Sequence, residues 1–255
     1  ATKEQFAERD ASARAFGEFY RNNKTDFPNE TQDSSYEKRI RDFYPIHPEL
    51  FDALAERWAS IPQFQKTRGI LRLMAKIIHF LWENNDQGPL ILPANIPLDS
   101  SEIQSELMRY LAPPWSAVIG KDVDGAHSLP RQLDSELPNI GRYSGSRRVA
   151  RTLFFATAPT FDAANKGINE QRIKLGSILP GETIPTFSDA LRHLVDKGTY
   201  LYAANKTFWY STQNNVNRTA EERASHIQEE KVEEEILALL TQQLQPSGSQ
   251  IRRIH

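Results

Sequence analysis

The chain has no cysteine and only 2 methionines among its 255 residues. Disulfide bridges and thiolate chemistry are therefore excluded. No apolar run approaches the roughly 18 residues of a membrane span, and no signal peptide is visible. The composition, 39% hydrophobic and 25% charged, is that of a globular protein of one or two domains. We expect a cytoplasmic protein without membrane contact. Because it begins with Ala1, we also expect a piece of a longer polypeptide.

The motifs of the common catalytic sites are also missing. Gly120-Lys121 is followed by Asp122, so the chain has no phosphate-binding Gly-x-x-x-x-Gly-Lys-Ser/Thr loop, and no apolar strand ends in Asp-Glu. Asp122-Val-Asp-Gly125 resembles the start of a calcium loop, but position 12 would be Leu133, which favours a plain turn. The six histidines show no metal-ligand spacing, and we expect His47 to pack or to cap a helix. The sequence predicts no catalytic residue and no metal site.

Charge is unevenly distributed along the chain. Residues 141–220 hold 11 Lys/Arg against 5 Asp/Glu, whereas residues 1–140 hold 16 against 21. A basic middle part indicates an anionic partner, of which nucleic acid is the common case, although a solvated basic face explains the same numbers.

The run from Gln63 to Trp82 is the most apolar stretch and predicts a central helix covered on nearly all sides. Its polar exceptions include Arg72, which stands in the first turn with Arg68 just before it. Cations at a helix N-terminus oppose the macrodipole, so these two indicate an anionic partner.

The rest of residues 1–140 predicts a mainly helical subdomain. Thr2–Tyr20 has helical periodicity with Phe6 among its inward aromatic residues, and Pro48 is placed to begin another helix. Residues 84–97 predict an extended connector, which a helix capped by Asp99 or Ser101 follows. Residues 115–140 show little regular periodicity.

Residues 141–218 predict a winged helix-turn-helix. Three helices are expected at 146–157, 169–178 and 186–197, followed by a β-hairpin over 199–212. The third helix would be the recognition helix and the hairpin the wing. The candidate nucleic-acid contacts are Arg147, Arg148 and Arg151, expected outward on the first helix, Arg192 and Lys197 on the third, and Lys206 at the wing tip.

Two acidic residues weaken that expectation. Asp189 and Asp196 share the third helix, so a structural or protein-contact role for the winged helix stays open. Residues 219–255 predict a Glu-rich amphipathic helix from Thr219 to Leu244 and a frayed end.

Four segments carry a resemblance to a known family: Tyr44-Pro-Ile-His-Pro-Glu-Leu50, Phe64-Gln-Lys-Thr-Arg-Gly-Ile-Leu-Arg-Leu73, Val149-Ala-Arg-Thr-Leu-Phe-Phe155 and Phe208-Trp-Tyr-Ser-Thr212. They resemble the later part of large prokaryotic AAA+-type ATPases that include a domain of unknown function, some of them from phage-defence islands of the BREX type. The resemblance spans about residues 36–225.

This resemblance implies a helical AAA+ lid over residues 1–140 and a winged helix over 141–218. It implies that Arg72, in the setting Gly69-Ile-Leu-Arg72, or Arg68 senses the nucleotide phosphates, whereas a pair between Arg72 and a carboxylate of the lid is the plainer alternative. ATP and Mg would then be held by an upstream ATPase core of the same polypeptide. Double-stranded DNA and other defence proteins are the further partners that it implies.

Two alternatives remain at this point. The chain is either a stand-alone winged-helix DNA-binding regulator whose helical half dimerises, or a scaffold that docks another protein without binding DNA.

Overall fold

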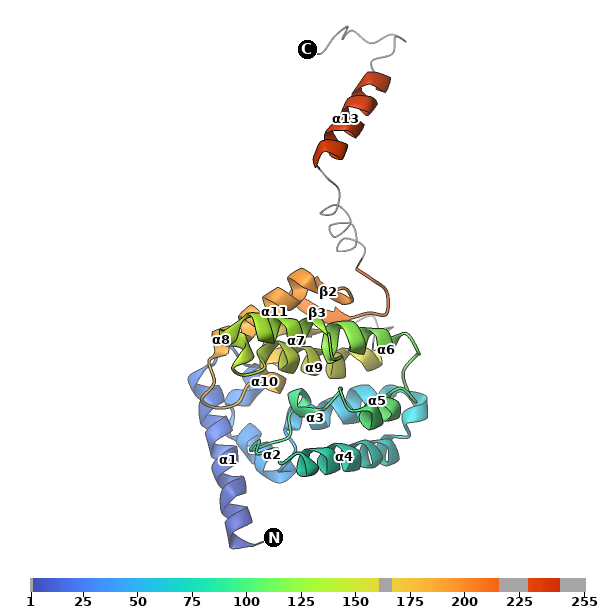
Figure 1. Cartoon of the computed structure of the whole chain (residues 1–255). Helices are drawn as coiled ribbons and strands as arrows, with labels where there is room; N and C mark the ends of the chain where they lie inside the picture. Colours follow the sequence, from blue (N-terminus) through green and yellow to red (C-terminus); the bar gives the residue numbers. More distant parts are fainter. Residues whose placement is uncertain (1, 161–166, 216–228, 244–255) are drawn as a thin grey trace. The chain divides into compact units, whose positions relative to one another are not determined.

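A computed structural model of the chain describes residues 2–160, 167–215 and 229–243 (Figure 1). The chain forms two compact units, residues 1–214 and 215–255. The described part is mainly helical, as expected, with one small antiparallel sheet. The first unit contains helices α1 (Lys3–Asn22), α2 (Ser34–Phe43), α3 (Pro48–Asp52), α4 (Lys66–Glu83), α5 (Ser101–Leu107), α6 (Trp115–Val118), α7 (Leu129–Glu136), α8 (Pro138–Gly141), α9 (Gly145–Thr157), α10 (Glu170–Ser177) and α11 (Ile184–Lys197), and strands β1 (Ile168–Asn169), β2 (Leu201–Ala204) and β3 (Thr207–Tyr210).

The expected first helix is confirmed as α1. Thr2 caps it, because its hydroxyl accepts a hydrogen bond from the backbone N–H of Gln5 at 3.3 Å while the Gln5 side chain accepts one from the N–H of Thr2 at 2.9 Å. Its aromatic residues Phe16 and Tyr20 are buried. Phe6, which was expected to face the core, is exposed because residues 2–8 lie on the surface all round the helix.

His47 is a capping and packing residue, as expected. Its Nδ1 accepts a hydrogen bond from the N–H of Glu49 at 3.1 Å at the start of α3, and Pro48 occupies the first turn. The Nδ1 atom therefore carries no hydrogen, and Nε2–H donates to the hydroxyl of Tyr20 at 2.9 Å. Burial, and then the charge of Arg39, lower the pKa of His47 to about 3.

The prediction that residues 63–82 form the covered central helix is wrong. Helix α4 buries Leu73, Met74 and Ile77 on one side only. On its other side Leu71 is 66% and Trp82 76% exposed. A helix with apolar residues all round can therefore be buried on one side and exposed on the other.

The central helix is α9, in which ten of thirteen residues are buried. It packs against α7, α10, α11 and the strand β3. Apolar residues are fewer in α9 than in α4, but small residues such as Ala150 and Thr152 let neighbouring elements approach it from several directions.

Two expectations for residues 98–140 are wrong. Ser100, not Asp99 or Ser101, precedes α5, and its side chain makes no capping hydrogen bond. Residues 115–140 are not irregular but contain α6, α7, α8 and a π-helical turn, Ile119–Val123. Helices of four to eight residues are too short to show several turns of apolar periodicity.

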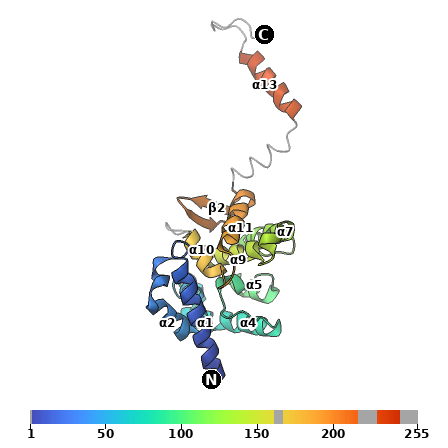
Figure 2. The ribbon, with the colours of Figure 1, turned by 90° about the vertical axis from the view of Figure 1, so that its left-hand side faces the viewer.

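The last part of the first unit runs α9, β1, α10, α11, β2, β3, with the sheet order β1-β3-β2. The expected hairpin is confirmed, with Tyr202 opposite Trp209, and Asn205 and Lys206 form its two-residue turn in left-handed conformations. Figure 2 shows this hairpin at the end of the first unit that lies away from the N-terminus of α1. The sequence did not reveal β1, because two residues are too few for an alternating pattern.

The second unit contains α13 (Glu229–Gln243), which is part of the helix expected over residues 219–244. The side chains of Ile236, Leu237, Leu239 and Leu240 are exposed on it. The rest of that predicted helix, and Arg218 at the end of the predicted winged helix, lie outside the described residues.

Candidate functional site

The start of α4 has an unusual backbone. Gln65 and Lys66 both have positive φ, 55° and 35°, directly after a 3-10 turn that ends at Phe64. A Cβ on Gly69 would lie 2.0 Å from the backbone oxygen of Phe64, so only glycine fits here. Strained non-glycine backbone of this kind gathers at functional sites. No side chain caps the helix, and its first turn contains no acidic residue.

Arg72 is held by a carboxylate and a hydroxyl from the α5 region. Its Nε lies 2.7 Å from Oε1 of Glu106, and its Nη2 donates to the hydroxyl of Tyr110 at 2.6 Å. Tyr110 in turn donates to Glu106 at 3.0 Å. The pair with a carboxylate that the sequence offered as an alternative to phosphate sensing is thus present. Even so, 43% of the Arg72 side chain remains exposed.

Glu106 is a buried carboxylate that three cations approach. Besides Arg72, Lys76 lies 3.4 Å and Arg109 3.7 Å from its Oε2. Burial raises the pKa of Glu106, but the hydrogen bond from Tyr110 and the cations outweigh burial, so the pKa is below its usual value. Lys76 also lies 3.2 Å from Oε1 of Glu102, so three cations face two carboxylates, which leaves this part of α4 and α5 with one excess positive charge.

Arg68 lies one turn before Arg72 and is exposed. It makes no ion pair or hydrogen bond through its side chain with the described residues. The two arginines predicted to sense nucleotide are therefore neighbours on the surface. Arg72 is held by Glu106 and Tyr110, whereas Arg68 has no such partner among the described residues.

The sequence predicted that the arginines of α9 point outward, and this prediction is wrong. Nη2 of Arg147 lies 2.8 Å and Nη2 of Arg151 2.5 Å from opposite oxygens of Asp124, which is fully buried. Both also contact Asp99, at 3.4 and 3.2 Å. Arg131 adds a third cation, 2.8 Å from Asp99. The cluster fixes α9 to the connector before α5 and to the segment after α6.

Arg148 is paired as well. Its Nη1 lies 2.5 Å from Glu182, and its guanidinium stands over the ring of Phe187 at 5.2 Å. The exposed fractions of Arg147, Arg148 and Arg151 are only 22, 16 and 13%. Their guanidinium groups therefore pair with carboxylates inside the unit.

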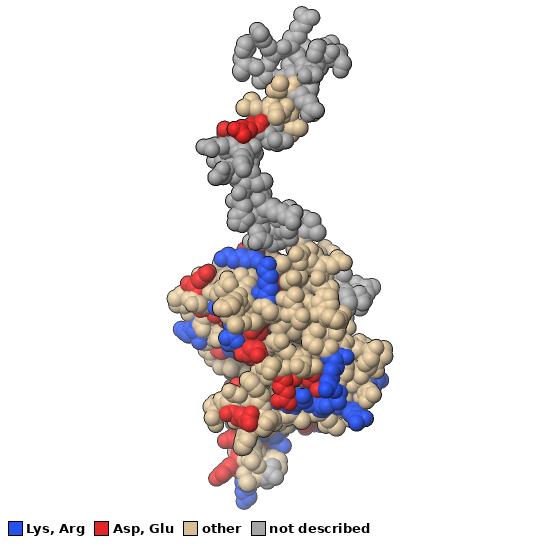
Figure 3. All heavy atoms as spheres, turned by 45° about the vertical axis from the view of Figure 1, so that its right-hand side comes forward, with Lys and Arg blue, Asp and Glu red and all other residues tan. Residues whose placement is uncertain are grey.

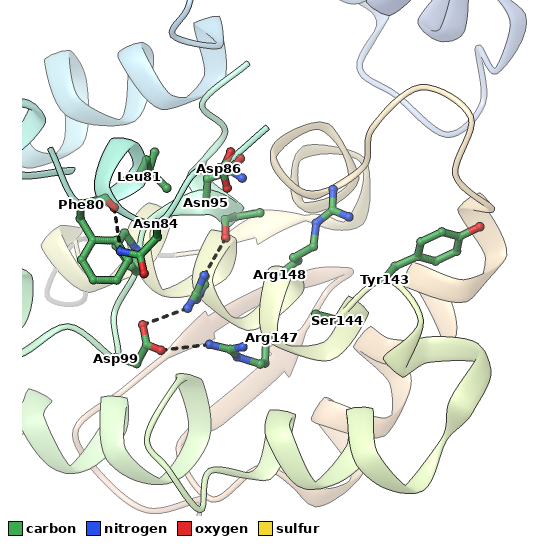
Figure 4. Close-up of a pocket in the computed structure, with 13 residues that line it drawn as sticks. Phe80, Leu81, Asn84, Asp86, Asn95, Asp99, Tyr143, Ser144, Arg147 and Arg148 are labelled. Atoms are coloured by element: carbon green, nitrogen blue, oxygen red, sulfur yellow. Dashed lines mark hydrogen bonds and ion pairs between the residues drawn. The ribbon is translucent and has the colours of Figure 1, made fainter. Parts of the chain in front are cut away.

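These arginines form one wall of a pocket of about 400 Å³, which Figure 4 shows with Asp99 joined to Arg147. The end of α4 and the connector form the other walls. Because Asp99, Asp124 and Glu182 neutralise the guanidinium groups, the pocket does not have the excess positive charge that an anion needs. The lining residues are Phe80, Leu81, Asn84, Asp86, Ala94, Asn95, Pro97, Asp99, Tyr143, Ser144, Arg147, Arg148 and Arg151.

The three remaining candidate contacts lie on the surface of α11 and the hairpin. Arg192 pairs with Asp189 at 2.9 Å, and both are exposed. Lys197 and Lys206 are exposed, and the left-handed turn carries Lys206 at its tip. Figure 3 shows blue and red side chains mixed with tan on one face, where the described residues form no continuous basic surface.

Asp122 is a buried carboxylate that the sequence did not reveal. Its Oδ2 accepts a hydrogen bond from the N–H of Tyr200 at 2.6 Å, just before β2, while its Oδ1 is buried without a hydrogen-bond partner. Burial raises its pKa to about 6, against the opposing effect of the Tyr200 hydrogen bond. Asp122 and Asp124 are two residues apart, but arginines pair with Asp124 whereas a backbone N–H binds Asp122. Sequence spacing gives no sign of this, since their partners lie 23 to 78 residues away.

The described residues contain no group of three or more acidic or histidine side chains that could hold a metal ion. Among the same residues no helix is long and apolar enough to cross a membrane.

Comparison with known families gives one match. Residues 6–166 fit the family model described as the DUF499 second domain, a domain of unknown function. The chain belongs to this family. The match runs from α1 past α9, so it includes α4, Asp124 and the arginine cluster, and it ends before β1. No curated protein and no solved structure matched the chain.

Proposed function

We propose that residues 1–140 of this DUF499 protein form the helical lid of a larger AAA+-type ATPase and that residues 141–218 form a winged helix. In this proposal the start of α4 reads the phosphates of a nucleotide bound by another part of the polypeptide. ATP and Mg belong to that part, because the 255 residues contain no phosphate-binding loop.

The observation that carries the proposal is the state of Arg72. Glu106 and Tyr110 fix two of its nitrogens, yet 43% of the side chain stays exposed beside the exposed Arg68. A guanidinium that is already oriented loses little conformational entropy when it binds a phosphate. The excess of cations around Glu106 means that an added anion lowers the local electrostatic free energy.

This geometry provides a simple response to hydrolysis. A cation that contacts the γ-phosphate loses that contact when the phosphate leaves, and the lid is then free to move. The Arg147–Asp124–Arg151 cluster would carry such a movement from the connector to α9 as one body, because its atoms are buried and tightly paired.

The winged-helix part of the proposal is supported by topology. One strand follows the first of three helices, a hairpin follows the third, and the first strand pairs with the last. We propose that Arg192, Lys197 and Lys206 are its contacts with double-stranded DNA, with a neighbouring domain as the alternative. Arg147, Arg148 and Arg151 are a poor choice for that role, since carboxylates already occupy them.

The cellular setting is proposed from the resemblance alone. The segments Phe64–Leu73 and Val149–Phe155 resemble large prokaryotic AAA+-type ATPases, some of which come from BREX-type phage-defence islands. A cytoplasmic ATPase that acts on or near DNA, with other defence proteins as partners, fits that setting.

The nucleotide proposal is tested in the polypeptide that joins this chain to its ATPase core. We expect Arg72→Ala to lower the ATP hydrolysis rate at least about tenfold, since it removes charge stabilisation at the phosphate. Lys121→Ala is the control, because Lys121 is an exposed cation outside the group around Glu106. Equal rates for both variants would contradict the proposal.

The DNA proposal is tested by fluorescence anisotropy of labelled duplex DNA at low and physiological salt. We expect binding that weakens steeply with salt and is lost in Arg192→Glu/Lys206→Glu. Arg109→Glu/Lys121→Glu makes the same change in net charge at exposed positions elsewhere and should keep most of the binding. Absence of binding at low salt would favour the neighbouring-domain role.

A further inference from the structure

The exposed side of α4 carries an apolar stripe. Leu71, Ala75, Ile78 and Trp82 follow one another at intervals of four, three and four residues, which places them on one side of a helix. Leu71 is 66%, Ile78 44% and Trp82 76% exposed. The stripe covers three helical turns, about 16 Å. An exposed apolar surface of this kind marks a site of interaction.

The charges of α4 oppose its dipole at both ends. Arg68 lies near the N-terminus, and no acidic residue occupies the first turn. Glu83 lies at the C-terminus, and no basic residue occupies the last turn. The macrodipole favours the reverse at each end. Among the described residues only His79, at 3.3 Å, approaches Glu83 within ion-pair distance.

We infer that the α4 stripe binds the same stripe of a second copy of this chain, with the two helices antiparallel. The four-three-four spacing is the same in both directions along the helix. A two-fold axis across the middle of the stripe therefore places Leu71 opposite Trp82 of the second copy and Ala75 opposite its Ile78. In the second of these pairs a small side chain faces a larger one, which suits close packing.

The same arrangement compensates the unfavourable charges at both ends of α4. Arg68, Arg72 and Glu83 lie on one flank of the stripe by helical spacing. In the antiparallel pair Arg68 of each copy lies beside Glu83 of the other, so two opposite-charge contacts form. Each basic N-terminus also lies near the negative end of the other helix dipole. An unrelated acidic helix would compensate Arg68 but not Glu83, which is why a second copy fits better.

The pair is expected to be weak. Few side chains per copy take part, so the interface lies below the usual size of a stable complex, and a micromolar dissociation constant is expected. The inference does not depend on nucleotide or on DNA. Arg72 keeps its pair with Glu106 in this arrangement, so failure of the nucleotide proposal leaves it unaffected.

The test is sedimentation velocity of the whole chain at concentrations up to about 1 mM. We expect a monomer–dimer equilibrium that Arg68→Glu and Glu83→Arg each weaken at least tenfold, since each variant places like charges together twice. An equimolar mixture of the two variants restores both opposite-charge contacts and should associate like the wild type. Each substitution agrees with the helix dipole, so α4 should stay folded.

A second pair of variants tests the apolar stripe. Trp82→Ser should weaken the dimer at least tenfold, whereas Phe6→Ser, at an exposed aromatic residue of α1, should leave it unchanged. The inference is overturned by a chain that stays monomeric, by a Trp82→Ser variant that associates normally, or by a mixture no tighter than its components.

Discussion

Helices α4 and α9 both combine an apolar run with several cations, yet they use them in opposite ways. In α9 the guanidinium groups of Arg147, Arg148 and Arg151 are mostly buried and meet carboxylates from other elements. In α4 Arg68 is exposed and makes no side-chain ion pair or hydrogen bond with the described residues, whereas Arg72 is fixed while still open to solvent. The helix with the more apolar sequence is the one with an exposed apolar face.

The difference shows what decides the role of a helical arginine. Asp99, Asp124 and Glu182 come from segments between 23 and 52 residues away from the α9 arginines. Burying these charges costs free energy that only such partners offset. The arginines of α9 hold the unit together, and those of α4 are available to an outside anion.

Loss of the buried carboxylate should have the largest effect on stability. Asp124→Ala leaves Arg147 and Arg151 without their main partner, which we expect to lower the free energy of unfolding by about 3 kcal/mol. Urea unfolding measures the change. In the exposed pair, Asp189→Ala should cost less than about 0.5 kcal/mol. Equal effects would remove the distinction between interior and surface charges.

Asp122 provides a second comparison, because it is buried and forms no ion pair with the residues that the structure describes. Its folded-state pKa, about 6, lies above the unfolded value, so its contribution to stability is complete below pH 3.8 and is lost as pH rises through 6. Asp122→Asn should therefore stabilise the fold at pH 7.5 by roughly 2 kcal/mol more than at pH 4. Urea unfolding of both proteins at these pH values checks this, and an equal difference at both would contradict it.

His47 gives an effect of similar size and opposite sign. Its folded-state pKa, about 3, lies below the unfolded value of 6.5, so the stability it provides is complete above pH 6.5 and is lost as pH falls toward 3. We expect a loss of about 2 kcal/mol between pH 7 and pH 5 in the wild type. His47→Asn, which keeps an acceptor for Glu49 N–H, should lack this loss, whereas the exposed His79→Asn should retain it. If stability depended on pH in the same way in both variants, His47 would not be the cause of the loss.

The sequence predicted the longer elements and missed what depends on distant partners. Helices α1, α10 and α11 and the β2–β3 hairpin were predicted from helical patterns and from two strand-like runs joined by a short turn. The strand β1 and the short helices α6 and α8 leave too few residues for a pattern. The paired state of the α9 arginines depends on Asp99 and Asp124, whose positions only the folded chain defines.

For the candidate site, the arginines on α4 were predicted and their surroundings were not. Arg68 and Arg72 stand out because cations at the start of a helix oppose its dipole. Glu106 and Tyr110 lie 34 and 38 residues from Arg72, and no local pattern connects them. The exposure of Leu71 and Trp82 could not be predicted either, because an apolar run that binds an outside surface has the same composition as one that is buried.

The most direct test compares Arg72→Ala with Arg147→Ala in the polypeptide that includes the ATPase core. For each variant, the ATP hydrolysis rate per folded molecule and the midpoint of urea unfolding of this domain are measured. The account predicts that Arg72→Ala loses hydrolysis with only a small loss of stability, because Lys76, Arg109 and Tyr110 still contact Glu106, whereas Arg147→Ala loses stability and keeps hydrolysis. If Arg147→Ala impaired hydrolysis as strongly as Arg72→Ala while remaining equally stable, the division between structural and nucleotide-reading arginines would be wrong.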